Sequence, residues 1–311
     1  LLKEVGAWDE LVHLEVRPAT HQEVTRIHTS DYLRLLEDTA QAGRGYLDLD
    51  TYVVSASFRA AMLAAGATLG AVEAVLGGQV DNAFALVRPP GHHALPGRGM
   101  GFCLLNNLAV AAQHALERYE LERILIFDFD AHHGNGTQAS FYRSARVLYF
   151  STHRYPFYPG TGHWREMGED AGKGFTVNVP LSAGAGDAGY MEICEELLQP
   201  LAERFQPELI LVSAGYDAHF LDPLARMELS PPGYFRLVRY LVKLAERLCQ
   251  GRLVLVLEGG YHLEALAWSV LASFNALLGA QCPDDPLGVP SAQEAPVNDV
   301  LATLRRLHGL G

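Results

Sequence analysis

Short apolar runs alternate with longer segments of helical character along most of this chain, and this alternation restricts its fold more than any other feature. The sequence predicts strands at residues 83–87, 123–127, 147–151, 175–179, 209–213 and 253–257. It predicts helices at residues 31–40, 55–76, 104–119, 135–143, 187–205, 231–249 and 263–278. Strands separated by helices pair in parallel, because a crossover between parallel strands needs a dozen or more residues. We therefore expect an α/β fold, a three-layer αβα sandwich around a mostly parallel sheet.

The size and charge of the chain narrow the possibilities further. The chain has 311 residues, of which 49% are hydrophobic, so it can bury a large core. We see no repeat or low-complexity linker and expect a single domain over residues 1–311. Lys+Arg number 24 and Asp+Glu number 36, which gives a net charge of −12. This acidity argues against direct binding of nucleic acid and favours cationic partners such as lysine-rich peptides or polyamines.

Cysteine usage and hydropathy point to a reducing, aqueous compartment. The 4 cysteines lie far apart in the sequence and form no CxxC motif, which argues against a disulfide framework or a cysteine zinc site. No signal peptide is visible, and polar residues interrupt the apolar stretch at 263–280, so we expect no membrane span. A cytoplasmic location is the expectation. The chain starts at Leu1 without a methionine, as a fragment or a trimmed chain would.

The segment Asp128-Phe129-Asp130-Ala131-His132 carries the clearest chemical signal. It follows the apolar run at 124–127 directly, which is typical of a buried central strand. In open α/β sheets, ligands and catalytic groups gather beyond the carboxyl ends of the strands. Asp and neutral His both ligate divalent metals, and the Asp130-x-His132 spacing places the two side chains on one side of an extended segment.

Polar residues also follow the other predicted strands. His92 and His93 come after the strand at 83–87, Asp217 after that at 209–213, and Tyr261 after that at 253–257. The carboxyl ends of parallel strands share one edge of a sheet, so these side chains can converge on the Asp130-x-His132 segment. We expect a metal-assisted hydrolase whose site lies at this edge.

These residue types supply complementary parts of a hydrolytic site. Asp130, His132 and Asp217 give the three protein ligands of a catalytic zinc, although an Asp/His set also accepts iron or cobalt. The His92-His93 pair can act as general base and then as general acid for a leaving amine. Tyr261 can donate a hydrogen bond to a developing oxyanion.

Several spaced motifs resemble those of the zinc-dependent histone deacetylase family, specifically its class II-like and bacterial amidohydrolase members. The matching segments are Arg88-Pro-Pro-Gly-His92-His93-Ala, Gly101-Phe102-Cys103, Asp128-Phe-Asp130-Ala-His132-His133-Gly-Asn135-Gly-Thr, Ser213-Ala-Gly-Tyr-Asp217 and Glu258-Gly-Gly-Tyr261. The resemblance spans residues 88–261. It implies the arginase-deacetylase fold, with about eight strands in the central sheet, and removal of acyl groups, chiefly acetyl, from lysine side chains.

The resemblance also implies a role for each matching residue. Zinc would be bound by Asp130, His132 and Asp217. His93 would be the general base and acid, His92 its electrostatic partner oriented by Asp128, and Tyr261 the group that polarises the scissile carbonyl. A structural potassium ion would be held by Asp128, Asp130, His132, Ser151 and Thr152. A narrow tunnel for the acyl-lysine chain would be lined by Gly101, Phe102, Tyr158 and Leu224.

The sequence departs from the family pattern at three places. Asn135 stands where some relatives have Asp behind the second histidine, which would change the basicity of His93. Tyr158 replaces the more usual Phe on one tunnel wall, with Phe157 as the other residue that could occupy that position. The resemblance also implies a segment before residue 1 that helps form the tunnel rim, which we expect this chain to lack.

Three other functions are alternatives to acyl-lysine hydrolysis. An acetylpolyamine amidohydrolase would use the same chemistry, but its specialised relatives carry Glu where this chain has Leu224. An arginase-like ureohydrolase needs more carboxylates, and Gly134 and His219 stand where those would be. A non-catalytic acyl-lysine reader would have lost the oxyanion donor, whereas Tyr261 is present. The expected partner is thus an acylated lysine peptide or protein, or a small acylated amine, with the oligomeric state left open.

Overall fold

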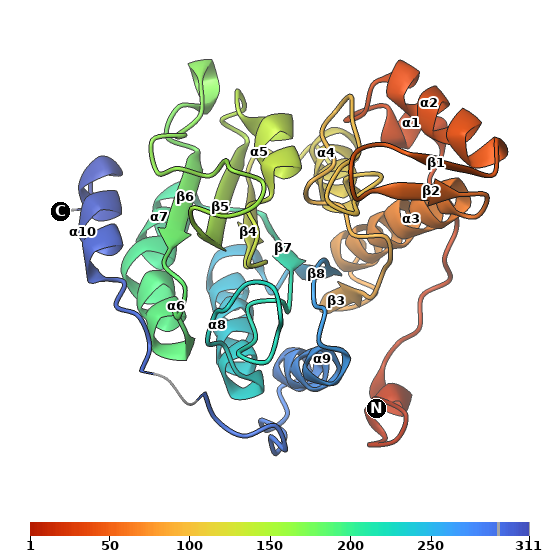
Figure 1. The fold of residues 1–311 in the computed structure, drawn as a ribbon. Helices are drawn as coiled ribbons and strands as arrows, with labels where there is room; N and C mark the ends of the chain where they lie inside the picture. Colours follow the sequence, from red (N-terminus) through yellow and green to blue (C-terminus); the bar gives the residue numbers. More distant parts are fainter. Residues whose placement is uncertain (291–292, 311) are drawn as a thin grey trace.

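The computed structural model describes residues 1–290 and 293–310 and is built around one central parallel sheet (Figure 1). Its six strands lie in the order β3-β8-β7-β4-β5-β6. In chain order they are β3 (Asn82–Ala85), β4 (Ile124–Asp128), β5 (Val147–Arg154), β6 (Thr176–Leu181), β7 (Leu209–Ala214) and β8 (Leu253–Leu257). All five neighbouring pairs are parallel, as predicted from the alternation of strands and helices.

The expected count of about eight strands in this sheet was wrong. The two remaining strands, β1 (Arg44–Tyr46) and β2 (Tyr52–Val54), pair with each other as a separate antiparallel hairpin. Each has only three residues, and its outward side chains are exposed. Such strands suit a surface hairpin, whereas the strands of a central parallel sheet are buried on both faces.

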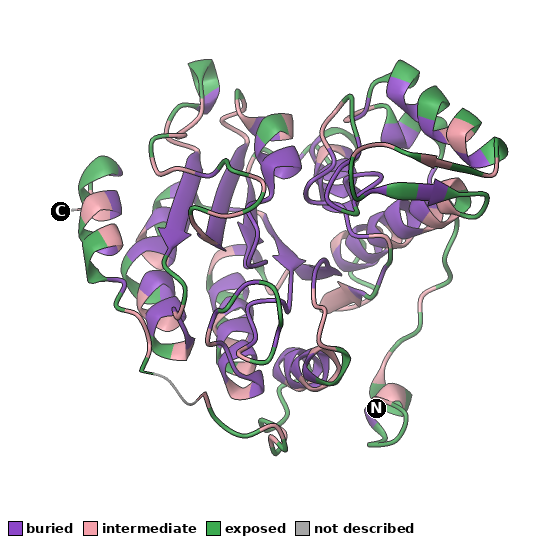
Figure 2. Ribbon diagram, in the orientation of Figure 1, coloured by how far each residue is buried: buried purple, intermediate pink, exposed green. Residues whose placement is uncertain are grey.

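Helices cover both faces of the sheet, and the side chains of each strand alternate between the two cores. In β4, Leu125 and Phe127 join one core while Ile124 and Ile126 join the other. The first core is closed by α6 (Asp187–Ile193), α7 (Gln199–Phe205), α8 (Pro231–Cys249), α9 (Leu263–Leu277) and α10 (Asn298–Leu307). The second is closed by α1 (His21–Val24), α2 (Ser30–Gln41), α3 (Ser57–Leu76), α4 (Asn107–Arg118) and α5 (Asn135–Phe141). Figure 2 shows the inner strands buried between these two layers, whereas β3 at the edge of the sheet is mostly intermediate. The αβα sandwich is confirmed.

Local sequence signals fix where several helices begin. The Ser230 hydroxyl accepts a hydrogen bond from the Gly233 N–H at 3.1 Å, and Pro231 opens α8. The Asn106 side chain accepts from the Ala109 N–H at 2.9 Å at the start of α4. These caps satisfy N–H groups that have no partner within the helix.

Several elements differ from the sequence-based expectation. The helix predicted at 187–205 is α6 and α7 joined by a π-helical turn at Cys194–Leu198. The helices α1 and α10 and the β1-β2 hairpin were not predicted. Within the described residues, α3 is the one helix long and apolar enough to cross a membrane by length and composition. Most of it is buried against the rest of the fold, as in a core helix.

The order of the strands creates a switch point beside β4. From β4 the chain adds β5 and β6 on one side, and then returns to place β7 and β8 on the other. The connections that follow β4 and β6 therefore run in opposite directions along the sheet, which opens a crevice beyond the carboxyl end of β4. The Asp128–His132 segment lies at this point.

Candidate active site

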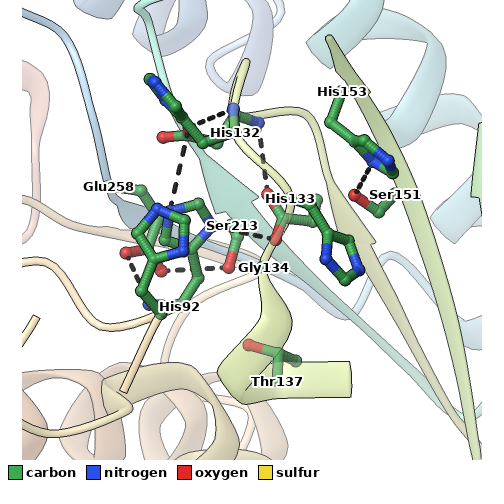
Figure 3. Close-up of polar contacts among 12 residues, drawn as sticks. His92, His132, His133, Gly134, Thr137, Ser151, His153, Ser213 and Glu258 are labelled. Atoms are coloured by element: carbon green, nitrogen blue, oxygen red, sulfur yellow. Dashed lines mark hydrogen bonds and ion pairs between the residues drawn. The ribbon is translucent and has the colours of Figure 1, made fainter. Parts of the chain in front are cut away.

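Four strand ends bring the predicted polar residues together at the switch point. Asp128 ends β4, and Asp130 and His132 follow it; Asp217 follows β7, Tyr261 follows β8, and the His92-His93 pair follows β3. Figure 3 shows His92 beside Glu258 and His132 close by, with Ser151 and His153 on the neighbouring strand. The convergence that the sequence predicted is present.

Asp130, His132 and Asp217 form a cluster with the geometry of a metal site. Each offers one donor atom, all within 4.8 Å of one another, and all three residues are buried. His132 Nδ1 lies 2.7 Å from Asp217 Oδ2 and 3.2 Å from Asp130 Oδ1. One imidazole nitrogen and two carboxylates facing a common point suit a divalent cation of borderline hardness such as zinc.

Backbone N–H groups hold both carboxylates in place. Gly259 N–H donates to Asp130 Oδ2 at 2.8 Å, and Ala131 N–H donates to Asp217 Oδ1 at 2.8 Å. A Cβ at Gly215 would lie 2.1 Å from Asp130 Oδ2, and one at Gly259 would lie 2.7 Å from the same atom. Glycine is thus required at both positions by the close approach of the backbone to the carboxylates.

The cluster brings two buried carboxylates together, and only a cation or a proton can balance their negative charge. Burial alone lowers the pKa of His132, but Asp217 and Asp130 outweigh it and raise that pKa to about 10. Burial and the nearby Asp130 raise the pKa of Asp217 to about 7. Two buried acids at this separation repel each other when both are ionised. A divalent cation between them would remove this repulsion, so the donor set fits the metal that the family implies.

The two histidines next to the cluster have different partners. His92 Nδ1 lies 3.1 Å from Asp128 Oδ2, whereas His93 Nδ1 lies 2.8 Å from the amide Oδ1 of Asn135. Their ring centroids are 4.0 Å apart. A carboxylate and an amide oxygen both accept from Nδ1–H, which leaves Nε2 of His93 as a free base.

These partners separate the pKa values of the pair. Burial lowers the pKa of His92, but Asp130 and Asp128 outweigh it and raise that pKa to about 10. Burial, with the positive charge of His92, lowers the pKa of His93 well below its usual value. At neutral pH the pair therefore consists of a charged His92 and a neutral His93, the division that acid–base catalysis requires.

Glu258 fixes the loop that carries the pair, a role that the sequence reasoning did not assign. Its Oε2 accepts the backbone N–H groups of Gly91 at 2.7 Å and His92 at 3.1 Å, and the Ser213 hydroxyl donates to its Oε1 at 3.0 Å. Burial raises its pKa to about 7. The only available signal was its place in the Glu258-Gly-Gly-Tyr261 motif.

Tyr261 is held through its backbone by Asp222, which the sequence reasoning also missed. Asp222 Oδ2 accepts the N–H groups of Tyr261 at 2.8 Å and His262 at 3.3 Å, and Oδ1 accepts the Leu224 N–H at 3.0 Å. The ring of Tyr261 lies 6.1 Å from that of Phe102. Burial raises the pKa of Tyr261, so its hydroxyl stays protonated and can donate.

The residues expected to line the tunnel lie around His93 and Tyr261. A Cβ at Gly101 would lie 2.6 Å from His93 Cδ2 and 2.9 Å from Tyr158 Oη, and Gly101 has φ of +56°. The ring of Tyr158 meets that of His93 edge-on at 5.2 Å and is partly exposed. Phe157, the alternative, stacks instead on His132 at 5.1 Å. This geometry favours Tyr158 over Phe157 as the exposed aromatic beside His93.

Phe102 and Leu224 are the most exposed of the expected tunnel residues, at 40% and 42%. The Phe102 N–H donates to Thr51 Oγ1 at 3.0 Å, which ties Phe102 to the loop after β1. Leu224 belongs to the same loop as Asp222. Both side chains therefore stand where an incoming substrate could touch them.

The residues expected to hold potassium also lie together. Asp128 and Ser151 are register partners on β4 and β5, and both are buried with Thr152. Asp128 Oδ1 accepts the Asp130 N–H at 3.2 Å, while Ser151 Oγ lies 2.9 Å from His153 Nδ1. The grouping agrees with the expected ligand set, and potassium binding stays a prediction.

Comparison with known proteins identifies the family. Residues 1–277 match the model of the histone deacetylase domain. The chain is 46% identical over 281 residues to a probable deacetylase of Archaeoglobus fulgidus, covering 89% of this chain and 78% of that protein. It is 42% identical over 272 residues to the histone deacetylase-like amidohydrolase of Pseudomonas aeruginosa, covering 87% and 72%. The crystal structure of the HDA15 HD domain superposes with a TM-score of 0.91 at 38% identity, over 99% of this chain and 85% of that one.

The fold and the site define a hydrolase, and the chain belongs to the histone deacetylase family. The resemblance inferred from the motifs is thereby confirmed. Substrates differ among the relatives, however. The human polyamine deacetylase HDAC10 is 42% identical over 306 residues, which are 94% of this chain and 44% of that protein.

Proposed function

We propose that this protein hydrolyses the side-chain amide of acetyl-lysine, or of another acyl-lysine, in peptides or proteins, with zinc as its metal. The observation that carries the proposal is the cluster of Asp130, His132 and Asp217 directly beside a neutral His93. A zinc ion held by these three residues would supply a Lewis acid that polarises a carbonyl and acidifies a water molecule.

His93 is the proposed proton carrier. Its Nε2 accepts a proton from the attacking water as the new C–O bond forms. The hydrogen bond from Nδ1 to the Asn135 amide oxygen then stabilises the positive charge of the ring. The protonated ring then donates to the amide nitrogen as the C–N bond breaks, which releases a carboxylic acid and an amine. His92 stays charged beside Asp128 and stabilises the negative charge of the reacting centre.

Tyr261 is the proposed oxyanion donor. Its hydroxyl stays protonated because burial raises its pKa, and Asp222 fixes the backbone that carries it. A hydrogen-bond donor that is already in place when negative charge develops stabilises the transition state more than a donor that must reorganise.

An acetylated polyamine is the second candidate substrate, supported by the 42% identity to a polyamine deacetylase. The net charge of −12 would also attract such cations. At the tunnel mouth, however, Leu224 offers no charge to a cationic chain. This favours acyl-lysine, whose own ammonium is neutralised by acylation. We further propose potassium at Asp128, Ser151 and Thr152 with the carbonyls of Asp130 and His132.

A substrate panel tests the proposal. Acetyl-lysine peptide, longer acyl-lysine peptides and acetylated polyamines are compared by kcat/KM on one preparation whose metal content is measured. Preference for the acyl-lysine peptides in zinc-loaded protein is expected. Higher kcat/KM on the acetylated polyamines would instead support the second candidate, and turnover of none by zinc-loaded protein would reject the hydrolase proposal.

A further inference from the structure

A pocket lies at the opposite edge of the sheet from the active site. It encloses about 690 Å³ beside the amino ends of β5 and β6, between α7 and the end of α10. Figure 1 shows α10 beside β6 at the edge of the sheet. The lining residues are Arg123, Ala145, Leu148, Met167, Lys173, Gly174, Phe175, Leu201, Arg204, Phe205, Leu307, His308 and Gly309. This volume is typical of sites for small organic molecules.

The floor of the pocket is apolar. Leu148 and Leu201 belong to the first core, and Phe175 packs edge-on against Phe205 with 5.8 Å between ring centroids. Leu307 is 42% exposed at the mouth. An apolar chain bound here would bury surface against these side chains, which is the main source of affinity for such ligands.

The polar side chains of the lining are basic, although the chain as a whole has a net charge of −12. Arg123, Lys173, Arg204 and His308 line the pocket, and none of the lining residues that the structure describes is acidic. Within the described residues, none of the three Lys/Arg side chains has a carboxylate oxygen within 4.0 Å. This is a local excess of positive charge on an acidic protein.

Neutral carbonyls position the two arginines without cancelling their charge. Arg204 donates to His308 O at 2.8 Å and to Gly309 O at 3.0 Å, and Arg123 Nε donates to Gln206 O at 2.7 Å. The nearby Glu208 carboxylate is occupied by the backbone N–H groups of Glu122 and Arg123. The guanidinium groups thus keep their charge and further donors for an anion.

His308 adds an unpaired polar group to this lining. Its side chain is buried, and among the described residues its Nε2 has no hydrogen-bond partner. Buried polar atoms in native proteins are nearly always paired, by protein, water or ligand. An unpaired ring nitrogen in a basic pocket is consistent with a site for an acceptor group.

We propose that this pocket binds a single-chain carboxylate with an unbranched aliphatic tail, the head group at Arg123, Lys173 and Arg204 and the tail over Phe175 and Phe205. The site is separate from the proposed catalytic site and does not depend on it. A basic rim above an apolar floor matches both halves of such a molecule, whereas a purely polar anion would leave the floor uncovered.

Calorimetric titration with decanoate, octanoate and decanol below their aggregation limits tests the proposal on the full 311-residue chain. Decanoate is expected to bind one to one and about tenfold more tightly than octanoate, because each buried methylene contributes about 0.8 kcal/mol. Decanol, which lacks the carboxylate, is expected to bind at least about tenfold more weakly than decanoate. Equal binding of decanol and decanoate, or no saturable binding of decanoate, would overturn the proposal.

Variants locate the binding in this pocket. The double variant Arg123→Gln with Lys173→Gln is expected to weaken decanoate binding about tenfold. Arg118→Gln with Lys243→Gln removes the same charges from exposed positions elsewhere and should leave binding unchanged. Leu307→Glu, which adds a negative charge at the mouth, should weaken binding more than Leu307→Gln. Equal affinities in the two double variants would place the ligand elsewhere, for example in the acyl tunnel, and would reject the proposal.

A last experiment distinguishes binding of a free carboxylate from binding to an anionic membrane surface. Vesicles containing phosphatidylglycerol are sedimented with the protein in the absence of fatty acid. Little co-sedimentation together with saturable decanoate binding supports the proposed pocket. Strong co-sedimentation that the Arg123→Gln, Lys173→Gln variant abolishes, without decanoate binding, would assign these cations to a lipid surface and contradict it.

Discussion

His93 Nδ1 lies 2.8 Å from the amide Oδ1 of Asn135, whereas its neighbour His92 faces the carboxylate of Asp128. Burial and the positive charge of His92 lower the pKa of His93, while Asp130 and Asp128 raise that of His92, so the two adjacent imidazoles have opposite charge states at neutral pH. The neutral amide orients the ring of His93 and raises its pKa less than a charged carboxylate would. Asn135 is therefore one determinant of the basicity of the residue proposed to move the proton.

Asn135→Asp should shift the pH dependence of the reaction. A carboxylate within hydrogen-bond distance would raise the pKa of His93 by about one unit or more. Because the neutral ring is the base, the acidic limb of kcat/KM would move upward by the same amount. A pH–rate profile measures this, with Asn135→Ala as the control that removes the acceptor without adding charge. An unchanged acidic limb in Asn135→Asp would show that His93 is not the group titrating there.

Tyr261→Phe should lower turnover by about 10²–10³-fold while the bound metal is unchanged, as expected for loss of one oxyanion donor. Tyr119→Phe removes a hydroxyl from a distant, exposed ring and should have no effect. Initial rates and elemental analysis of the same samples give both quantities. Wild-type turnover in Tyr261→Phe would reject the donor role.

Asp222 is a positioning residue for Tyr261, since its carboxylate binds the Tyr261 and His262 N–H groups. Asp222→Ala should lower kcat by about 10- to 100-fold, because small displacements of catalytic groups have effects of this size. Asp222→Asn keeps one acceptor and should recover part of the loss, and metal content should stay at the wild-type level in both. A purely structural role would instead lower thermal stability with no change in kcat of the folded enzyme.

His28 should make the protein less stable in acid. Its Nδ1 lies 3.1 Å from Leu95 O and its Nε2 accepts the Asn106 N–H at 2.9 Å. Burial lowers its pKa from 6.5 to about 4. The neutral form is thus favoured by folding, so this stability is complete above pH 6.5 and is lost as the pH falls toward 4. The full loss is roughly 3 kcal/mol.

Chemical denaturation between pH 7.5 and 4 measures this contribution. His28→Gln should be less stable at pH 7.5 but lose less stability on acidification than the wild type. His13→Gln, at an exposed position, should keep the wild-type dependence. Parallel curves for His28→Gln and the wild type would contradict the assignment.

The sequence predicted the central strands and the site residues on them because both signals are local. An apolar run such as 124–127 must be buried wherever it lies, and the polar residues that follow it share one edge once the strands are parallel. Asp130, His132 and Asp217 can thus be grouped from the sequence, and in the structure their donor atoms lie within 4.8 Å of one another.

The supporting residues could not be predicted in the same way. Asp222 accepts an N–H group 39 residues away, and Glu258 accepts one 166 residues away. Backbone N–H groups leave no trace in side-chain patterns, so only the tertiary fold reveals such pairs. The β1-β2 hairpin escaped prediction because its three-residue strands are too short to show a period. The wrong count of about eight strands came from the family resemblance, since the sequence itself predicted six strands.

The most direct test of the account is the metal dependence of hydrolysis. Purified protein is stripped with a chelator, assayed on acetyl-lysine peptide, and titrated with zinc while bound metal is measured. We predict one bound zinc per chain, full loss of activity when the metal is removed, and recovery of activity at one equivalent of zinc. The double variant Asp130→Ala, Asp217→Ala should not bind zinc. Undiminished hydrolysis by metal-free protein, or wild-type zinc binding in the double variant, would contradict the account.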